Sequence, residues 1–371
     1  MSLKDIFCQD IAIAILQKAL AADKIPHAYI FAGPEGVGKS ATAREWARLL
    51  LCEKYDIENG FADSCGLCRS CRLFEAGSHP DFNHVYKELL EFTREGKGKK
   101  TPVDLPIDVI REFLIEKVSM RPTLSKRKVF VVSEAERLNK YSQNALLKSL
   151  EEPPEYCCII MLCTRMEKLL PTTKSRCQII RFGPVAEDRI IEKLREMGAD
   201  EQPARYFARL SQGSLGQAYR WAELKLADGN LYQMKKQLLN SLVKYEYAGA
   251  LDLAQWLLGE SKKIATFWTD LDETTSGTDI NRRARTTLVQ IIISALQDAM
   301  KLNATPAKSL INFDQKEQLQ KLAGRFNPEQ AAGKITDCYR MLRWIESSVN
   351  EKLIFEWLLL NLSASVKMKV F

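Results

Sequence analysis

Residues 33–40 read Gly-Pro-Glu-Gly-Val-Gly-Lys-Ser and fit the pattern G-x-x-x-x-G-K-[ST] of a phosphate-binding loop. The apolar run at 28–32 before them predicts a buried strand, and residues 41–51 after them predict a helix. In this setting the backbone N–H groups of the loop and the helix N-terminus converge on phosphates. A chance glycine-rich turn, or a remnant loop that no longer binds nucleotide, are the two alternatives. The motif predicts a site for ATP or ADP with Mg²⁺ that is formed by Gly33, Gly36, Gly38, Lys39 and Ser40.

Short apolar segments around this motif alternate with stretches of helical period over roughly the first 180 residues. The pattern predicts an α/β domain in which a parallel sheet carries helices on both faces. The strands are expected at 28–32, 83–86, 129–133, 158–163 and 178–182.

After Gly183-Pro184 the strand signals stop, and the rest of the chain has the pattern of helices. We therefore expect three domains: a nucleotide-binding domain over 1–183, a small helical lid over 184–235 and an all-helical oligomerisation domain over 236–371.

The composition excludes several classes of protein. With 371 residues, 46% of them hydrophobic and 27% charged, the chain is too long for a single small module and too apolar for a disordered protein. No apolar run approaches the ~18 residues that span a bilayer, and no signal-peptide core follows Met1, so we expect a cytoplasmic protein. The 54 basic against 47 acidic residues permit a polyanionic partner without requiring one.

Four of the ten cysteines lie close together in the sequence, at Cys52, Cys65, Cys68 and Cys71. Four thiolates are the ligand set of a closed, tetrahedral structural zinc site, so this spacing predicts structural Zn²⁺ in an insertion at 52–71. Part of an iron–sulfur motif and free structural cysteines are the alternatives, although the further cysteine element of the iron–sulfur motif is missing. A closed site leaves no position for a metal-bound water, which excludes a catalytic role.

A site that hydrolyses ATP also needs an acidic residue at the end of a neighbouring strand, usually an Asp that holds Mg²⁺ and often a following Glu. Here the expected strand at 129–132 is followed by Ser133 and Glu134. A serine hydroxyl is a weaker, uncharged partner for Mg²⁺, so we expect this chain to bind ATP and to hydrolyse it weakly or not at all. Glu134 is the candidate for polarising a water, with a surface acid at the start of a helix as the alternative.

Further motifs follow in order along the chain: His27 to Phe31, His79-Pro80-Asp81, Asn144-Ala-Leu-Leu-Lys-Ser-Leu-Glu-Glu-Pro-Pro154 and Ser175-Arg176-Cys177. Together with the phosphate loop and the four cysteines they resemble bacterial DNA polymerase III clamp-loader subunits, which are AAA+ proteins. The resemblance covers roughly residues 1–220. It implies a hetero-oligomer, expected to be a pentamer, that uses ATP to place a sliding clamp on primed DNA.

The same resemblance implies two further site residues. Arg176 lies where the family has an arginine finger that reaches the ATP of a neighbouring subunit, and Thr164 lies at the sensor-one position near the γ-phosphate. An ordinary surface arginine and a hydroxyl that caps a turn at the strand end are the respective alternatives.

Two subunit types in this family share these motifs, a motor type (gamma/tau) and a delta-prime type. The motor type has an Asp-Glu pair after the strand and an Arg in a G-S-x-R segment, whereas this chain has Ser133-Glu134 and Gly213-Ser-Leu-Gly216. The departures resemble the delta-prime type. An active motor ATPase is the rival, and a stand-alone P-loop kinase or a zinc-dependent DNA-binding protein are rivals of another class. The basic loop at 94–100 either contacts DNA or is simply solvated.

Overall fold

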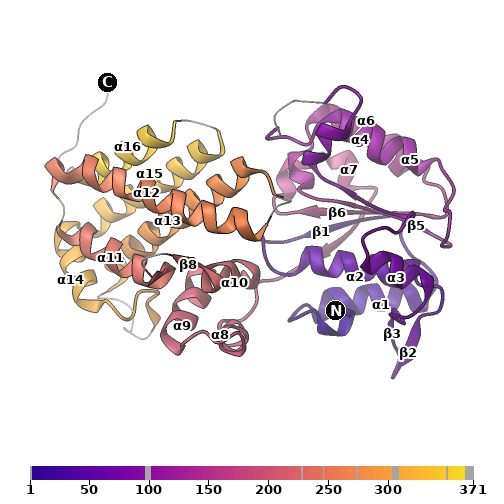
Figure 1. Cartoon of the computed structure of the whole chain (residues 1–371), viewed down its shortest axis with the longest axis horizontal. Helices are drawn as coiled ribbons and strands as arrows, with labels where there is room; N and C mark the ends of the chain where they lie inside the picture. Colours follow the sequence, from indigo (N-terminus) through magenta and orange to yellow (C-terminus); the bar gives the residue numbers. More distant parts are fainter. Residues whose placement is uncertain are drawn as a thin grey trace. The chain divides into compact units, whose positions relative to one another are not determined.

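The computed structural model describes residues 2–96, 102–226, 229–244, 246–272, 275–302, 309–347 and 350–363. Four residues of the basic loop, 97–100, lie outside them. The chain divides into two compact units, and Figure 1 colours it along the sequence. The phosphate-loop unit comprises Met1–Ala186 with Gly213–Gly216, and the helical unit comprises Glu187–Gln212 with Gln217–Phe371.

The phosphate-loop unit is built on a five-stranded sheet in the order β4-β5-β6-β1-β7, with every neighbouring pair parallel. Every residue of β1, β5 and β6 is buried, as expected for a parallel sheet covered on both faces. The expected parallel α/β fold is therefore confirmed. The strands are β1 (Ala28–Ala32), β4 (Phe82–Val85), β5 (Lys128–Val132), β6 (Cys157–Cys163) and β7 (Gln178–Arg181).

Helices cover both faces of this sheet, and alternate strand residues enter two separate cores. Tyr29 and Phe31 of β1 pack with α1 and α2, whereas Ile30 packs with the helical segments after residue 105. On the first face lie α1 (Asp10–Ala21), α2 (Lys39–Leu51) and α3 (Arg69–Glu75), and on the second α4 (Ile107–Ile110), the π-helical turn η3 (Arg111–Ile115), α5 (Glu116–Val118) and α6 (Lys140–Glu151).

The remaining elements of this unit are short. They are η1 (Leu3–Asp5), the hairpin β2 (Asp56–Glu58) and β3 (Phe61–Asp63), η2 (Lys87–Phe92), η4 (Ala135–Arg137), η5 (Met166–Lys168) and α7 (Pro171–Lys174).

The described residues of the helical unit form helices, as expected, except for a two-stranded ribbon of β8 (Lys225–Leu226) and β9 (Gly229–Asn230). Its longest helix, α13, packs against α12 and α15, and α12 packs against α16. No helix in the described ranges is long and apolar enough to cross a membrane. The helices are α8 (Glu187–Glu196), α9 (Glu201–Leu210), α10 (Leu215–Glu223), α11 (Leu231–Lys244), η6 (Tyr247–Gly249), α12 (Ala250–Leu271), α13 (Gly277–Lys301), α14 (Lys316–Arg325), α15 (Pro328–Glu346) and α16 (Glu351–Ser363).

The His79-Pro80-Asp81 motif lies just before β4 and anchors neighbouring loops. The buried Asp81 carboxylate accepts backbone N–H groups from Thr123, Leu124 and Ser125 at 2.6–2.8 Å. Burial alone would raise the pKa of Asp81, but these donors and the neighbouring His79 hold that pKa below its ordinary value. This motif therefore fixes the loop that leads into β5, the strand that Ser133 and Glu134 follow.

Candidate nucleotide site and metal centre

The phosphate loop leaves β1 at Gly33, where the backbone approaches the end of β7 closely. The Gly33 N–H donates to the Cys163 carbonyl at 3.1 Å, and a Cβ at this position would lie only 2.3 Å from the Phe182 carbonyl oxygen. Gly38 precedes α2 with a φ of +102°, a conformation that side chains rarely adopt. The glycines at these two positions are therefore required by the geometry of the loop.

Lys39 begins α2, and its side chain folds back onto the loop. Its ammonium donates to the carbonyls of Gly33, at 2.7 Å, and of Pro34, and the residue is 7% exposed. Burial lowers the pKa of Lys39, and the negative charges of Glu136 and Glu35 oppose that shift. To bind a phosphate, the ammonium must exchange these carbonyls for phosphate oxygens. Ser40 next to it is exposed.

Gln9, just before α1, ties the loop to the chain after β7. Its side-chain amide donates to the carbonyls of Val37 and Gly183, both at 2.9 Å, and its oxygen accepts the Gly183 N–H at 3.3 Å. Sequence reasoning missed Gln9, because nothing in the local pattern indicates a contact with residues so distant along the chain.

The Gly213–Gly216 segment lies directly against the phosphate loop. The Ser214 hydroxyl donates to the Glu35 carbonyl at 2.7 Å, and the Gly216 N–H donates to the Gly36 carbonyl at 2.8 Å. A Cβ at position 216 would lie 3.1 Å from the Cα of Gly36. The position at which the resemblance implies a motor-type arginine therefore holds a glycine in tight contact with the loop.

Both residues after β5 are engaged by other side chains. The Ser133 hydroxyl shares a hydrogen bond with His84 Nε2 at 2.8 Å. Glu134 has a left-handed backbone (φ +49°), and its carboxylate pairs with Lys87 Nζ at 3.2 Å and with Arg137 Nε at 2.8 Å. Two cations therefore compete with any water for the Glu134 carboxylate.

Glu136, two residues further on, is the acid that interacts with both Thr164 and Lys39. Its carboxylate accepts the Thr164 N–H at 3.1 Å and the Thr164 hydroxyl, and its charge raises the pKa of Lys39 against the effect of burial. The structure thus brings Thr164 together with an acid that sequence reasoning missed. The sequence signal that could have indicated Glu136 is its position two residues after Glu134, in the loop that follows β5.

Arg176 follows α7, and its guanidinium is held by residues of the same chain. Its guanidinium forms an ion pair with Glu151 at 2.7 Å and donates to the Thr172 carbonyl at 2.9 Å, and about a third of the side chain is exposed. Glu151 ends α6, in the segment whose sequence contributed to the resemblance. The polar partners of Arg176 lie on α6, α7 and the turn after α7.

The four cysteines of the insertion converge. Cys52 follows α2, and Cys68 caps the N-terminus of α3. The Cys52 sulfur lies 3.5 Å from that of Cys65, 3.9 Å from that of Cys68 and 3.6 Å from that of Cys71, and all four sulfurs lie within 4.8 Å of one another.

These distances match tetrahedral zinc, because Zn–S bonds of about 2.3 Å place the sulfurs about 3.8 Å apart. Backbone N–H groups of Cys65, Cys68 and Cys71 each point at a cysteine sulfur, at 3.3–3.5 Å. Burial raises the pKa of the Cys52 and Cys71 thiols, whereas at Cys65 the N–H groups of Leu67 and Cys68 outweigh burial and help to lower the pKa to about 7. The donor set therefore fits a structural Zn²⁺.

Arg48 of α2 lies beside this cluster. Its guanidinium interacts with the Cys71 sulfur and lies 3.6 Å from Glu45 and 3.7 Å from Glu75. A cation at this position offsets part of the negative charge that four thiolates and one Zn²⁺ would carry.

Comparisons with known proteins show which family this chain is similar to. The family model described as "DNA polymerase III, delta subunit" matches residues 8–186, and that described as "DNA polymerase III, delta subunit, C terminal" matches residues 279–364.

Three curated relatives are similar over parts of the chain. The delta' subunit of DNA polymerase III from Pseudomonas aeruginosa is 38% identical over 151 residues, covering 41% of each chain. The delta' subunit from Escherichia coli is 34% identical over 58% of this chain and 59% of that protein. The tau/gamma subunit from Haemophilus influenzae is 31% identical over 67% of this chain and 33% of that protein. The matches thus span between 33% and 59% of these relatives.

Among solved structures, a gamma subunit-related protein of DNA polymerase III from Thermotoga maritima aligns at 17% identity, with a TM-score of 0.40, over 95% of this chain and 98% of that chain. The fold rests on the sheet and helices described above rather than on this alignment. The two family models, which lie in different units, and the delta' relatives confirm the expected resemblance. The chain belongs to the family of DNA polymerase III clamp-loader subunits.

Proposed function

We propose that this chain is a delta-prime-type subunit of a clamp loader in the cytoplasm and helps ATP-dependent loading of the sliding clamp onto primed DNA during replication. The observation that carries the subunit type is the tight contact of Gly216 with Gly36. A motor-type arginine is absent from position 216, and its Cβ would be crowded there. The similarity to delta' relatives points the same way.

The proposed nucleotide role of this chain is binding with weak or absent hydrolysis. ATP or ADP with Mg²⁺ would be held by the phosphate loop, at Gly33, Gly36, Gly38, Lys39 and Ser40. The phosphates of the bound nucleotide could then be sensed by a neighbouring subunit. Hydrolysis is disfavoured because Ser133 is engaged by His84 and Glu134 by Lys87 and Arg137. Thr164 would serve as sensor one once its hydroxyl leaves Glu136.

The proposed role of Arg176 is that of an arginine finger for the ATP of an adjacent subunit. The partial exposure of the Arg176 side chain supports this role, and its guanidinium would exchange the ion pair with Glu151 for a phosphate of the neighbouring ATP. Structural Zn²⁺ at Cys52, Cys65, Cys68 and Cys71 would hold the insertion in place.

The proposed partners are the other clamp-loader subunits in a pentameric hetero-oligomer, the sliding clamp and primed DNA. We also propose that residues 184–235 form a lid and residues 236–371 an oligomerisation domain. The lid is supported by the return of the chain to the phosphate loop at Gly213–Gly216. Exposed apolar residues on the last helices, Tyr339 and Leu353, are available for subunit contacts.

The rival reading, an active motor subunit, draws on the intact phosphate loop and the tau/gamma relatives. One experiment separates the two. The full chain is co-purified with the gamma/tau and delta subunits of its own organism, the native mass is measured, and phosphate release is followed for the chain alone and for the complex. We expect one copy in a pentamer and almost no turnover by the isolated chain. Brisk turnover by the isolated chain with clamp and DNA would make it a motor.

A further inference from the structure

Strand β4 forms one edge of the sheet and, among the strands of the described residues, pairs only with β5. Val129 N–H donates to the Asp81 carbonyl at 2.8 Å and Ser133 N–H to the Val85 carbonyl at 2.9 Å, so odd-numbered residues direct their backbone groups to β5. Because backbone direction alternates along a strand, the backbone groups of His84 point away from β5 and toward the open edge. Unpaired backbone groups at the edge of a sheet can form hydrogen bonds with a further strand.

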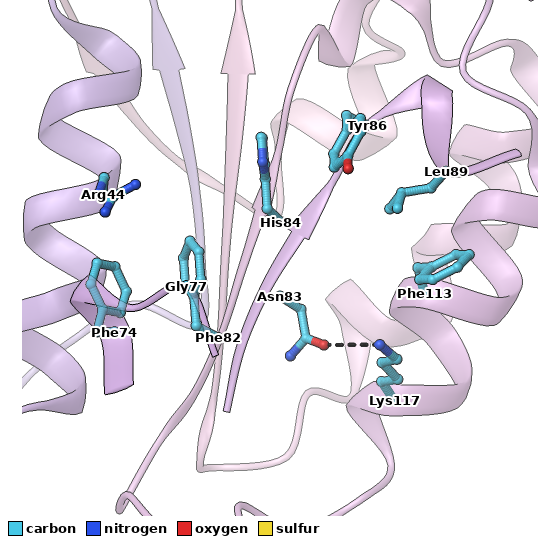
Figure 2. Close-up of a pocket in the computed structure, with 10 residues that line it drawn as sticks. All are labelled: Arg44, Phe74, Gly77, Phe82, Asn83, His84, Tyr86, Leu89, Phe113 and Lys117. Atoms are coloured by element: carbon cyan, nitrogen blue, oxygen red, sulfur yellow. Dashed lines mark hydrogen bonds between the residues drawn. The ribbon is translucent and has the colours of Figure 1, made fainter. Parts of the chain in front are cut away.

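A pocket of about 360 Å³ lies along this edge and receives side chains from both sides of β4. Figure 2 shows Arg44 and Phe74 on one side of the strand and Phe113 and Lys117 on the other. A bound segment in extended conformation sends alternate side chains to opposite faces, so it would meet both walls. The arrangement fits a strand better than a compact ligand.

Most side chains of this pocket are aromatic or donate hydrogen bonds, Leu89 being aliphatic, and none of its lining residues is acidic. Phe74 and Phe82 are in contact, with ring centroids 4.7 Å apart, and Lys117 Nζ lies 5.1 Å from the centroid of the Phe113 ring. Phe113 itself lies in the π-helical turn Arg111–Ile115, a rare geometry that is frequent at functional sites.

The two cations of the pocket are not neutralised. Among the described residues, neither Arg44 nor Lys117 has a carboxylate within 4.0 Å, although both lie near aromatic rings. Lys117 donates to Asn83 Oδ1 at 3.2 Å. The Nδ2 of Asn83 is buried and has no hydrogen-bond partner among the described residues. Burial and the charge of Lys128 lower the pKa of Lys117. A carboxylate from outside would pair with Lys117 and satisfy Asn83.

We infer that the open edge of β4 binds an extended segment of a partner protein that carries acidic and apolar residues on each of its two faces, and that this segment adds a sixth strand to the sheet. Its main chain pairs with the outward-facing groups of His84. Its acidic side chains meet Lys117 and Asn83 on one face and Arg44 on the other, and its apolar side chains pack on the phenylalanine rings. This mode of recognition gives affinity through the backbone and specificity through alternate side chains.

The test uses the full chain, immobilised, and a phage library of random nine-residue peptides. We expect the selected peptides to carry acidic and apolar residues at both odd-numbered and even-numbered positions, so that each face of the strand presents both kinds. The best peptide is then synthesised, and its dissociation constant is measured by fluorescence anisotropy for the wild-type chain and for Lys117→Met and Arg44→Met. Each substitution should weaken binding by about tenfold or more, whereas Lys117→Arg keeps part of the affinity and the exposed control Lys24→Met changes nothing.

Backbone N-methylation of the peptide distinguishes strand pairing from simple anion binding. Methylation on the edge that faces β4 should abolish binding, whereas methylation on the opposite edge should not. Equal affinity of both methylated peptides would overturn strand addition. A library that yields no peptide dependent on Arg44 or Lys117 would overturn the whole inference, provided that circular dichroism shows both variants to be folded.

Discussion

The backbone N–H of Gly216 donates to the carbonyl of Gly36 at 2.8 Å, which places a segment that follows α9 directly on the phosphate loop. Gly213 makes this path possible, because its φ of +91° is left-handed and a Cβ there would lie 2.3 Å from the Cβ of Pro184. The segment therefore occupies the approach to the loop with glycines at both ends. The Cβ of an arginine introduced at 216 would lie 3.1 Å from the Cα of Gly36, so the loop backbone would have to shift to admit it.

This packing leads to a prediction about repairing the site. Ser133→Asp restores the acid after β5, but it leaves Glu134 paired with Lys87 and Arg137 and leaves glycine at 216. We expect phosphate release by the isolated Ser133→Asp chain to stay at the background of the wild type. A rise to the level of a motor subunit would show that Ser133 alone limits turnover.

Glu136 should weaken nucleotide binding. Its carboxylate acts on Lys39 and accepts the Thr164 hydroxyl, so it lies near the place where the outer phosphates would bind. Glu136→Gln removes the negative charge and should strengthen ATP binding several-fold in isothermal titration, while Lys39→Ala weakens it. The exposed Glu167→Gln serves as the charge-matched control. Unchanged affinity in Glu136→Gln would mean that the phosphates bind elsewhere.

The zinc centre predicts about one Zn²⁺ per chain by elemental analysis and no visible absorption from iron. Cys68→Ser removes a ligand and should release the metal and loosen residues 52–71 in hydrogen exchange, because the binding energy is local folding energy. The matched control is Cys177→Ser, since Cys177 lies outside the cluster. Iron in place of zinc, or full zinc content in Cys68→Ser, would contradict the assignment.

The local parts of this architecture could be predicted from the sequence. The phosphate loop between β1 and α2 follows from an apolar run, a glycine pattern and a helical period within one short stretch, and the cysteine cluster follows from spacing. The contacts of Gln9 with Val37 and of Lys87 with Glu134 could not be predicted, because they join segments whose proximity only the sheet order determines. The hairpin Asp56–Asp63 inside the cysteine insertion was also missed, since its strands have three residues each.

Asp81 should make the phosphate-loop unit sensitive to acid. The pKa of Asp81 is lower in the folded chain than in the unfolded one, so its stabilising effect is complete above about pH 4 and is lost as the pH falls through the folded pKa. Asp81→Asn removes the charged acceptor of three N–H groups and should cost about 2 to 3 kcal/mol in urea unfolding at pH 7. The loss of unfolding free energy in Asp81→Asn should be smaller in acid, because the wild-type Asp81 carboxylate becomes protonated there. An equal loss at pH 7 and pH 3 would contradict the role of the charge.

The helical unit depends on a buried ion pair. Lys235 is fully buried, its ammonium lies 2.5 Å from Asp314, and Tyr232 donates to the other oxygen of that carboxylate at 2.9 Å. Lys235→Met leaves Asp314 buried with too few partners and should cost about 3 to 5 kcal/mol in thermal or urea unfolding. The partly exposed ammonium of Lys236 lies 3.8 Å from the Asp314 carboxylate, so Lys236→Met should cost less than about 1 kcal/mol. Similar losses in both variants would count against the buried pair.

The last prediction concerns Arg176, which its ion pair with Glu151 holds at the end of α6. An arginine finger stabilises charge that develops on a transferred phosphoryl group, and fingers of this kind are worth about 10³ to 10⁵ in rate, or roughly 4 to 7 kcal/mol. Arg176→Ala should therefore leave the fold and this chain's own ATP affinity intact while it abolishes turnover at one site of the assembled loader.

Total ATPase of the complex should fall only in part, because the other sites retain their own fingers, but clamp loading should fall further if the sites act in a coupled order. Lys at position 176 should not rescue loading, since an ammonium lacks the planar, bidentate geometry of guanidinium. Glu151→Gln keeps the arginine but removes the anionic partner that orients its guanidinium, so we expect an intermediate loss. If the Arg176→Ala complex assembles normally and loads clamps at the wild-type rate, Arg176 has no role at the neighbouring site, and its contacts with Glu151 and Thr172 are purely structural.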